Sequence, residues 1–182
     1  MSAESIVQFC APTLAGIKVG SLFSARYENE SSVRQFLEEQ NRQLSRKGVR
    51  MVALKVADGL ALFYVYRRRQ LHQVLLVKEN QDFLEGCGYT EFLEEHCLDI
   101  LRDRLRLQDF PHEIGVFLGY PLADIKEFIR HKGCDCPCQG CWKAYTNLEN
   151  AKRTFEQYRT CTRLYCEWYD QGADIARLTV AG

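Results

Sequence analysis

Residues 49–66 read Val49-Arg-Met-Val-Ala-Leu-Lys-Val-Ala-Asp-Gly-Leu-Ala-Leu-Phe-Tyr-Val-Tyr66. Both ends of this segment are rich in β-branched and aromatic residues, which is typical of β-strands. Between them stands Ala57-Asp58-Gly59, and the Asp-Gly pair is a strong short-range signal for a hairpin turn. Leu60–Tyr66 is apolar at successive positions, so both of its faces are expected to be buried. The sequence therefore predicts an antiparallel hairpin of Val49–Val56 and Leu60–Tyr66, with the second strand central in a sheet.

Helical patterns surround this hairpin. Upstream, Ser32 and Gln35 have capping-box spacing and open an apolar face that ends at Gly48, while residues 19–27 supply another candidate strand. Downstream, helices are predicted over residues 93–105, from Pro121 to Gly133, and from about 148 to 170. The pattern predicts an α+β fold in which a small antiparallel sheet of about three or four strands is covered by several helices. Residues 1–182 are expected to form a single domain.

Charge and hydropathy argue against two classes of partner. Formal net charge is zero, so no overall attraction to nucleic acid or to anionic lipid is expected. The most apolar stretch, residues 51–66, is interrupted by Lys55 and Asp58, so no membrane span is expected. The N-terminus lacks a secretion signal, and nine cysteines without one indicate a reducing cytoplasmic location. A protein partner stays open as a candidate.

The densest chemical feature is Cys134-Asp-Cys136-Pro-Cys138-Gln-Gly-Cys141, a cysteine-rich loop at residues 134–141 that follows the helix-ending Gly133. Thiolates favour soft metals, so Zn, Cu(I) and Fe are candidate cofactors. These four cysteines lack the spacer that separates the two cysteine pairs of a usual closed zinc site. Two or three of these thiolates together with His131, Cys161 or Cys166 would therefore surround one metal ion more easily. Cys138 and Cys141 are the best-spaced pair. Redox chemistry and a solvated loop without a ligand are the alternatives.

Polar residues in apolar surroundings mark two other segments. In Cys10-Ala-Pro-Thr-Leu-Ala-Gly-Ile-Lys18, Pro12 and Gly16 suggest a fixed turn in which Lys18 lowers the thiol pKa of Cys10; the alternative is a buried, inert Cys10. In Phe110-Pro-His-Glu-Ile-Gly-Val-Phe-Leu-Gly-Tyr-Pro121, His112 is a candidate base or ligand, and Glu113 its orienting partner. The alternative is that Glu113 only stabilises the first turn of a short helix.

Two basic groups complete the candidates. Lys152, Arg159 and Arg163 lie side by side on the last predicted helix, as a solvated face or as a patch for an anion or a partner. Arg67-Arg68-Arg69 and His72 follow the second hairpin strand, where they are solvated or make a local phosphate contact.

Four segments together carry a family resemblance: the Cys10–Lys18 and Phe110–Pro121 segments, Tyr64-Val-Tyr-Arg67 and Trp142-Lys143-Ala-Tyr145. The chain resembles the domain-of-unknown-function 3793 family, found mainly in anaerobic Gram-positive bacteria, over nearly its whole length. The resemblance implies a single-domain cytosolic protein with no assigned activity, loosely associated with iron-uptake and flavodoxin genes. In the family pattern the Trp-Lys-x-Tyr block follows a loop that often carries one cysteine. Cys141 matches it, whereas Cys134, Cys136 and Cys138 look like additions.

Three functional hypotheses follow. The first is a thiol-based metal-binding or redox/iron-homeostasis accessory protein that uses Cys134, Cys136, Cys138 and Cys141. The second is an enzyme with a pocket formed by Cys10, Lys18, His112 and Glu113, in which Lys143 and Tyr145 are candidates for binding a cofactor. The third is a protein-interaction module without small-molecule chemistry. The sequence does not decide whether the protein is an enzyme.

Overall fold

The computed structural model describes residues 2–107 and 110–182. A three-stranded antiparallel sheet lies at its centre, with strands β1 (Gly20–Arg26), β2 (Val49–Ala57) and β3 (Leu60–Arg67) in the order β1-β3-β2. At the turn between β2 and β3, Asp58 and Gly59 both have positive φ, 52° and 74°, as the tight hairpin turn requires. The predicted hairpin, its central strand and the α+β class are therefore confirmed.

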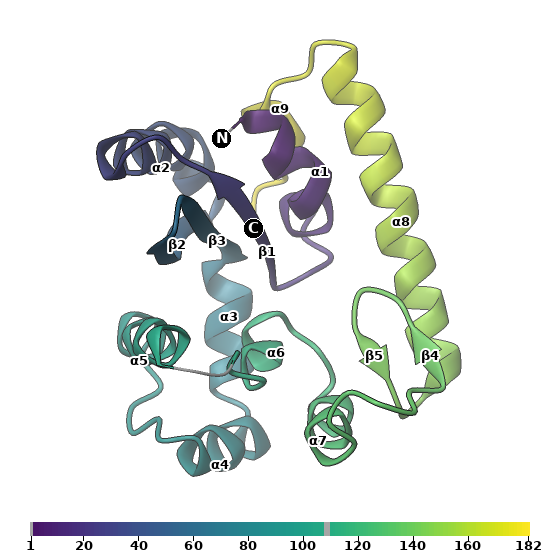
Figure 1. Cartoon of the computed structure of the whole chain (residues 1–182). Coiled ribbons are helices and arrows are strands. Elements are labelled where there is room, and N and C mark those ends of the chain that lie inside the picture. Colours follow the sequence, from purple (N-terminus) through teal and green to yellow (C-terminus); the bar gives the residue numbers. More distant parts are fainter. Residues whose placement is uncertain (1, 108–109) are drawn as a thin grey trace.

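Both faces of β3 are buried, which explains its continuous apolar sequence. Ala61, Phe63 and Val65 point into a core shared with helices α1 (Ala3–Leu14) and α2 (Glu30–Leu44). Tyr64 and Tyr66 point into a second core, which helices α3 (Arg68–Leu75), α4 (Lys78–Gly86), α5 (Glu94–Arg106) and α6 (Ile114–Phe117) complete. In Figure 1, α1 and α2 lie above the strands and α3 to α6 below them.

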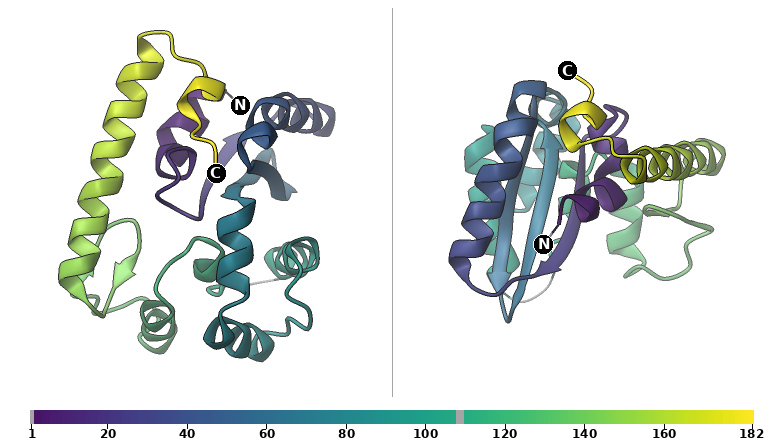
Figure 2. Two further views of the ribbon diagram at one scale, coloured as in Figure 1. Left: turned by 180° about the vertical axis from the view of Figure 1, so that it is seen from behind. Right: turned by 90° about the horizontal axis from the view of Figure 1, so that it is seen from above.

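Most of the remaining elements lie to one side of the sheet, whereas the last short helix, α9 (Ile175–Leu178), packs back against α1 and α2. Helix α7 (Leu122–Arg130) leads to a two-stranded hairpin, β4 (Cys138–Gln139) and β5 (Lys143–Ala144), and then to the long α8 (Leu148–Asp170) and to α9. Helix α8 packs along α1 (Figure 2). The N-terminal end of α8 lies beside the β4–β5 hairpin, and its C-terminal half lies beside α1. The predicted helix boundaries at 148 and 170 are confirmed.

Several local expectations were wrong. Residues 3–14 form helix α1, with Pro12 inside its last turn, and the chain turns only at Gly16, where φ is 83°. Helix α2 is capped by Asn29, whose side chain accepts a hydrogen bond from the Ser32 amide, so Ser32 is not the capping residue. Within the expected cysteine-rich loop, Cys138 and Gln139 are in strand β4. Helices α3 and α4 were not anticipated.

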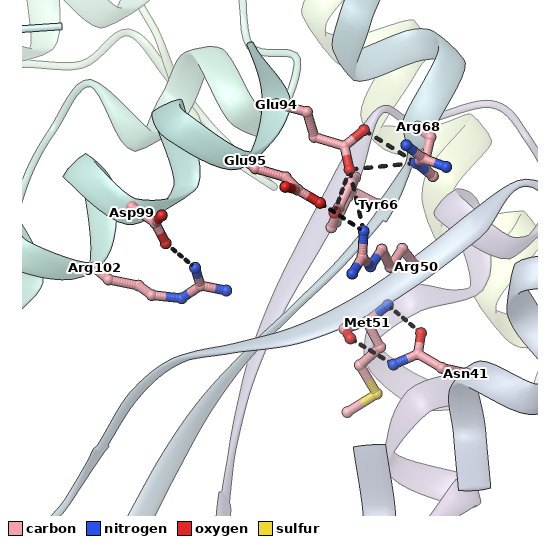
Figure 3. A network of polar contacts seen from close by, with 9 residues as sticks. All are labelled: Asn41, Arg50, Met51, Tyr66, Arg68, Glu94, Glu95, Asp99 and Arg102. Carbon is pink, nitrogen blue, oxygen red and sulfur yellow. Dashed lines mark hydrogen bonds and ion pairs between the residues drawn. The ribbon is translucent and has the colours of Figure 1, made fainter. Parts of the chain in front are cut away.

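Polar side chains connect the helices to the sheet, as Figure 3 shows. The Asn41 side chain on α2 both donates to the carbonyl of Met51 (2.8 Å) and accepts from its amide (2.9 Å), so it satisfies the backbone of the edge strand β2. On the other face, Glu94 of α5 accepts a hydrogen bond from the Tyr66 hydroxyl (2.9 Å) and pairs with Arg68 (3.2 Å). These contacts fix α2 and α5 on opposite faces.

Arg67, the first residue of the Arg67-Arg68-Arg69 run, has a structural role. Arg67 is buried, and its guanidinium donates to the carbonyls of Thr13, Leu14 and Val180. It therefore stabilises the C-terminal end of α1, where partial negative charge collects, and attaches the C-terminal segment to it. Arg68 and Arg69 are exposed. The expectation of a solvated or phosphate-binding arginine was therefore wrong for Arg67.

Among the residues that the structure describes, every helix is too short or too polar to cross a bilayer.

Candidate functional site

The β4–β5 hairpin is held against α7 by one carboxylate. Asp124, in the first turn of α7, is buried, and its oxygens accept hydrogen bonds from the Trp142 indole (2.8 Å), from the amides of Tyr145 (2.9 Å) and Thr146 (2.7 Å), and from the Thr146 hydroxyl (2.8 Å). A carboxylate with this many donors is fully occupied as an acceptor. Asp124 is therefore the anchor that positions Trp142 and the segment after it.

Lys143 and Tyr145 hold the start of the cysteine segment. The Lys143 ammonium donates to the carbonyl of Gly133 (2.6 Å), and the Tyr145 hydroxyl donates to the carbonyl of Cys134 (2.8 Å). The Tyr145 ring also stacks on His131, with centroids 5.3 Å apart. Both residues were candidates for cofactor binding, and both bind backbone carbonyls that follow α7.

The four loop cysteines have different surroundings. Cys134 and Cys141 are exposed, whereas Cys138 packs with Trp142 and Phe155 in a small apolar cluster. Cys141 lies at the hairpin turn, and its backbone carbonyl accepts a hydrogen bond from Tyr120 (2.8 Å). In the described part of the chain, no three Cys, His, Asp or Glu side chains are grouped closely enough to hold a metal ion. A site with three or more protein ligands would therefore require this segment to rearrange.

A pocket of about 330 Å³ opens between α7, the hairpin and the Phe110–Pro121 segment. Its walls are mainly apolar and aromatic. The lining residues are Phe110, His112, Ile114, Gly115, Leu118, Tyr120, Asp124, Ile125, Phe128, Gln139, Gly140, Trp142 and Lys143. Both the Phe110–Pro121 segment and the Trp142–Tyr145 block therefore contribute walls to one cavity, whose volume lies in the range typical of small-molecule sites.

Two predicted site residues meet in this pocket, around Phe128. The exposed His112 ring meets the Phe128 ring edge-on, with centroids 5.0 Å apart. Lys143 lies near the same ring, its ammonium 6.0 Å from the centroid. Among the described residues, none forms a hydrogen bond with the His112 imidazole, whereas Asp124 and Lys143 are already bonded within the protein. His112 is therefore, with the exposed Gln139, a polar group of this pocket that is available to a ligand.

Glu113, next to His112 in sequence, serves a different part of the molecule. It is buried, pairs with Arg104 of α5 and accepts a hydrogen bond from the Tyr89 hydroxyl (3.4 Å). The hydrogen bond from Arg104 to Glu113, together with the charge of Glu113, raises the pKa of Arg104. Burial, followed by the charge of Glu113, raises the pKa of Tyr89. Glu113 thus connects α5 to the segment before α6 and does not orient His112.

Cys10 and Lys18 also have separate surroundings. Cys10 is fully buried in the core between α1 and the sheet, and burial raises its thiol pKa from 9.0 to about 12. Lys18 is half-buried after the Gly16 turn, over the rings of Tyr120 and Tyr158 at 5.4 and 5.8 Å. The four residues of the expected enzyme pocket therefore have four different surroundings: Cys10 lies in the core, Lys18 over two tyrosine rings, His112 at the pocket beside α7 and Glu113 in an ion pair.

Three residues central to the site were missed from sequence. Asp124, Tyr120 and Trp142 shape the pocket: Tyr120 stacks on Trp142 with centroids 5.2 Å apart, and Asp124 binds the Trp142 indole. The sequence did contain the two halves of this contact. Asp124 lies in the first turn of the helix predicted after Pro121, and the indole, amide and hydroxyl donors of residues 142–146 follow about twenty residues later. Nothing in the local sequence pairs these segments.

Comparison with known proteins gives a family. No curated protein and no solved structure matched the chain. A family model described as "Protein of unknown function (DUF3793)" matches residues 6–179, which includes every pocket residue named above. Because the match covers nearly the whole sequence, the chain belongs to the DUF3793 family of proteins of unknown function.

Proposed function

We propose that the protein binds a small, largely apolar molecule in the pocket between α7, the β4–β5 hairpin and the Phe110–Pro121 segment. The observation that carries this proposal is a cavity of about 330 Å³ whose walls include Phe110, Phe128 and Trp142. Ligand pockets are typically apolar cavities of this size with a few convergent polar groups. Two of the sequence segments that mark the family, separated in the chain by α7, line it together.

The arrangement of polar groups supports a planar aromatic ligand with one polar substituent. Aromatic rings favour stacked or edge-on contacts with other rings, and Phe128 and Trp142 offer such faces. His112 and Gln139 are exposed at the pocket, where either can bond a ligand oxygen or nitrogen. Asp124 is occupied by four protein donors, so it serves as a wall and an anchor rather than as a base.

The test uses the neutral fluorescent probe N-phenyl-1-naphthylamine. We expect saturable binding to the wild-type protein and at least about tenfold weaker binding to His112→Trp, because the larger ring fills the pocket mouth and a loss of that size is about 1.4 kcal/mol. His72→Trp is the matched control, since His72 is also exposed, lies on α3 and does not line the pocket. Equal affinity of the wild type and His112→Trp would refute the proposal.

A second candidate function is soft-metal binding by the thiols of residues 134–141. One observation supports it: the four loop cysteines are free and at least partly accessible, whereas Cys10 and Cys97 are buried. Zn²⁺ and Cu(I) both favour thiolate ligands, and iron is bound by thiolates in some sites. Because ligand thiols must lose their protons, metal binding by this segment should weaken as pH falls.

Metal content per chain in anaerobically purified protein tests this second function. Wild type should contain about one metal ion per chain and Cys138→Ser/Cys141→Ser much less. Cys87→Ser is the control, because Cys87 is partly accessible but follows α4, outside the loop. Wild-type protein with almost no metal would exclude soft-metal binding and leave the pocket proposal unaffected.

A further inference from the structure

A second cavity lies on the other side of the β4–β5 hairpin. It is a groove of about 700 Å³ between α1, the start of β1, the hairpin turn and α8. Phe9, Pro12, Phe155 and Tyr158 provide its apolar surfaces. Its cations are Lys18, Arg159 and Arg163, and none of the described residues that line it is acidic. The charged side chains that line the groove are therefore all positive, in a chain whose formal net charge is zero.

Lys18 has no carboxylate partner among the described ion pairs. Its ammonium lies 3.5 Å from the Ser21 hydroxyl and over the Tyr120 and Tyr158 rings. Burial lowers its pKa, and the thiols of Cys141 and Cys10 oppose that shift. A half-buried ammonium without a counter-ion is costly, because burial disfavours the charged form. A negative ligand group would offset that cost.

The arginines on α8 are available at the rim. Arg159 pairs with Glu156 (2.9 Å) and Arg163 with Glu167 (2.8 Å), each within one turn of the same exposed helix. Such exposed pairs contribute little to stability, so both guanidinium groups can exchange their partner for a ligand anion at small cost. Lys152, the third cation of the sequence pattern, does not line the groove.

We infer that this groove binds an amphipathic organic anion, whose acidic group lies at Lys18 and between the α8 arginines and whose apolar body lies on Phe9, Pro12 and Phe155. The exposed Phe9 ring, 50% accessible, supplies an apolar surface beside the charges. Cation and apolar surface together favour a carboxylate, sulfonate or phosphate carried on a hydrocarbon or aromatic body over an inorganic anion alone. This site is separate from the pocket lined by His112, although Gln139 and Gly140 border both.

The probe for this inference is 8-anilinonaphthalene-1-sulfonate, which carries a sulfonate on the same kind of arylamine body as the neutral probe above. Binding should be saturable and should weaken as ionic strength rises. We expect at least about a tenfold loss of affinity in Lys18→Met and a severalfold loss in Arg159→Gln/Arg163→Gln. Lys18→Arg should retain most of the affinity, and Lys152→Met, on the same helix but outside the groove, should match wild type.

The position of the bound anion is read from Cys141, which lines the groove. The sulfonate should slow alkylation of Cys141 by iodoacetamide and leave Cys134 unaffected. Lys18→Met can disturb packing, which a loss of its near-ultraviolet circular dichroism would reveal. In that case Arg159→Gln/Arg163→Gln tests the inference, because the Arg159 and Arg163 side chains are exposed. Wild-type affinity in the arginine variant, or no protection of Cys141, would overturn the inference. Neither result would affect the neutral probe in the His112 pocket.

Discussion

The Lys18 ammonium lies 5.4 Å from the centroid of the Tyr120 ring, and this contact joins two segments about a hundred residues apart in the sequence. Tyr120 also stacks on Trp142 and donates a hydrogen bond to the carbonyl of Cys141 (2.8 Å). Its ring lines the His112 pocket, and Lys18 lines the groove behind it. Tyr120 is therefore a partition between the two cavities.

The first prediction concerns this partition. Tyr120→Phe should cost about 1 kcal/mol of unfolding free energy, because it removes one hydrogen bond and keeps the ring. Tyr120→Ala should cost about 3–4 kcal/mol, because it also removes the contacts with Trp142 and Lys18 and leaves a cavity. Urea unfolding measures both. Tyr27→Phe, a change in a partly buried tyrosine just after β1 that keeps the ring, is the control and should be near neutral, because none of the described hydrogen bonds involves the Tyr27 hydroxyl. Equal, small effects of both Tyr120 variants would contradict the assigned role.

The sheet could be read from the sequence because its signals are local. Asp58-Gly59 fixes the turn, and the apolar run of β3 reports burial on both faces within one strand. Helix α8 was equally readable, since the predicted range of about 148 to 170 matches its observed bounds. Helix α1 was not, because Pro12 and Gly16 are turn residues, yet Pro12 fits the last helical turn and its carbonyl accepts from the amides of Ile17 and Lys18.

The site was only partly readable. The enzyme hypothesis places His112 and Lys143 in one pocket, and both line the same pocket in the structure, whereas Cys10, Lys18 and Glu113 do not line it. The grouping depends on Asp124, whose carboxylate draws residues 142–146 onto α7 through hydrogen bonds to backbone amides and side chains. Amides are present at every position except proline, so such a long-range anchor leaves almost no signature in a single sequence.

The second prediction concerns that anchor. Asp124→Ala should lower the free energy of unfolding by about 3 kcal/mol, because buried amide and indole donors lose their acceptor. Hydrogen exchange should accelerate at the amides of Tyr145 and Thr146 in particular, and binding in the His112 pocket should weaken with it. Asp103→Ala is the matched control, since Asp103 is exposed and pairs with the exposed Arg106. Unchanged exchange at residues 145 and 146 would argue against the anchor.

The third prediction concerns the cysteines. In native protein at pH 8, Cys10 and Cys97 should resist alkylation, because both are buried and burial raises their thiol pKa, to about 12 and about 11. Cys134 and Cys141 are exposed and should react within the same period. Peptide mapping after timed iodoacetamide treatment measures each site, and all nine should react in denaturant. Rapid native labelling of Cys10 would restore it as a catalytic candidate.

The last prediction concerns stability at alkaline pH. Cys10 has a thiol pKa raised from 9.0 to about 12 in the folded protein. Above pH 9 the unfolded chain therefore releases this proton while the folded chain retains it. The stability associated with the neutral buried thiol is fully present below about pH 9 and is lost as pH rises toward 12, by at most about 1.4 kcal/mol per pH unit.

The variant Cys10→Ala isolates this contribution. At pH 7 it should be less stable than wild type by about 1 kcal/mol, because a buried sulfur leaves a small cavity. Between pH 9 and 10.5 wild type should lose stability more steeply than the variant, so the difference should shrink and then reverse in sign. Urea unfolding at half-unit pH steps measures this. Cys134→Ala, which replaces an exposed thiol, should run parallel to wild type throughout. Parallel curves for Cys10→Ala as well would mean that Cys10 ionises in the folded protein, which its complete burial between α1 and the sheet opposes.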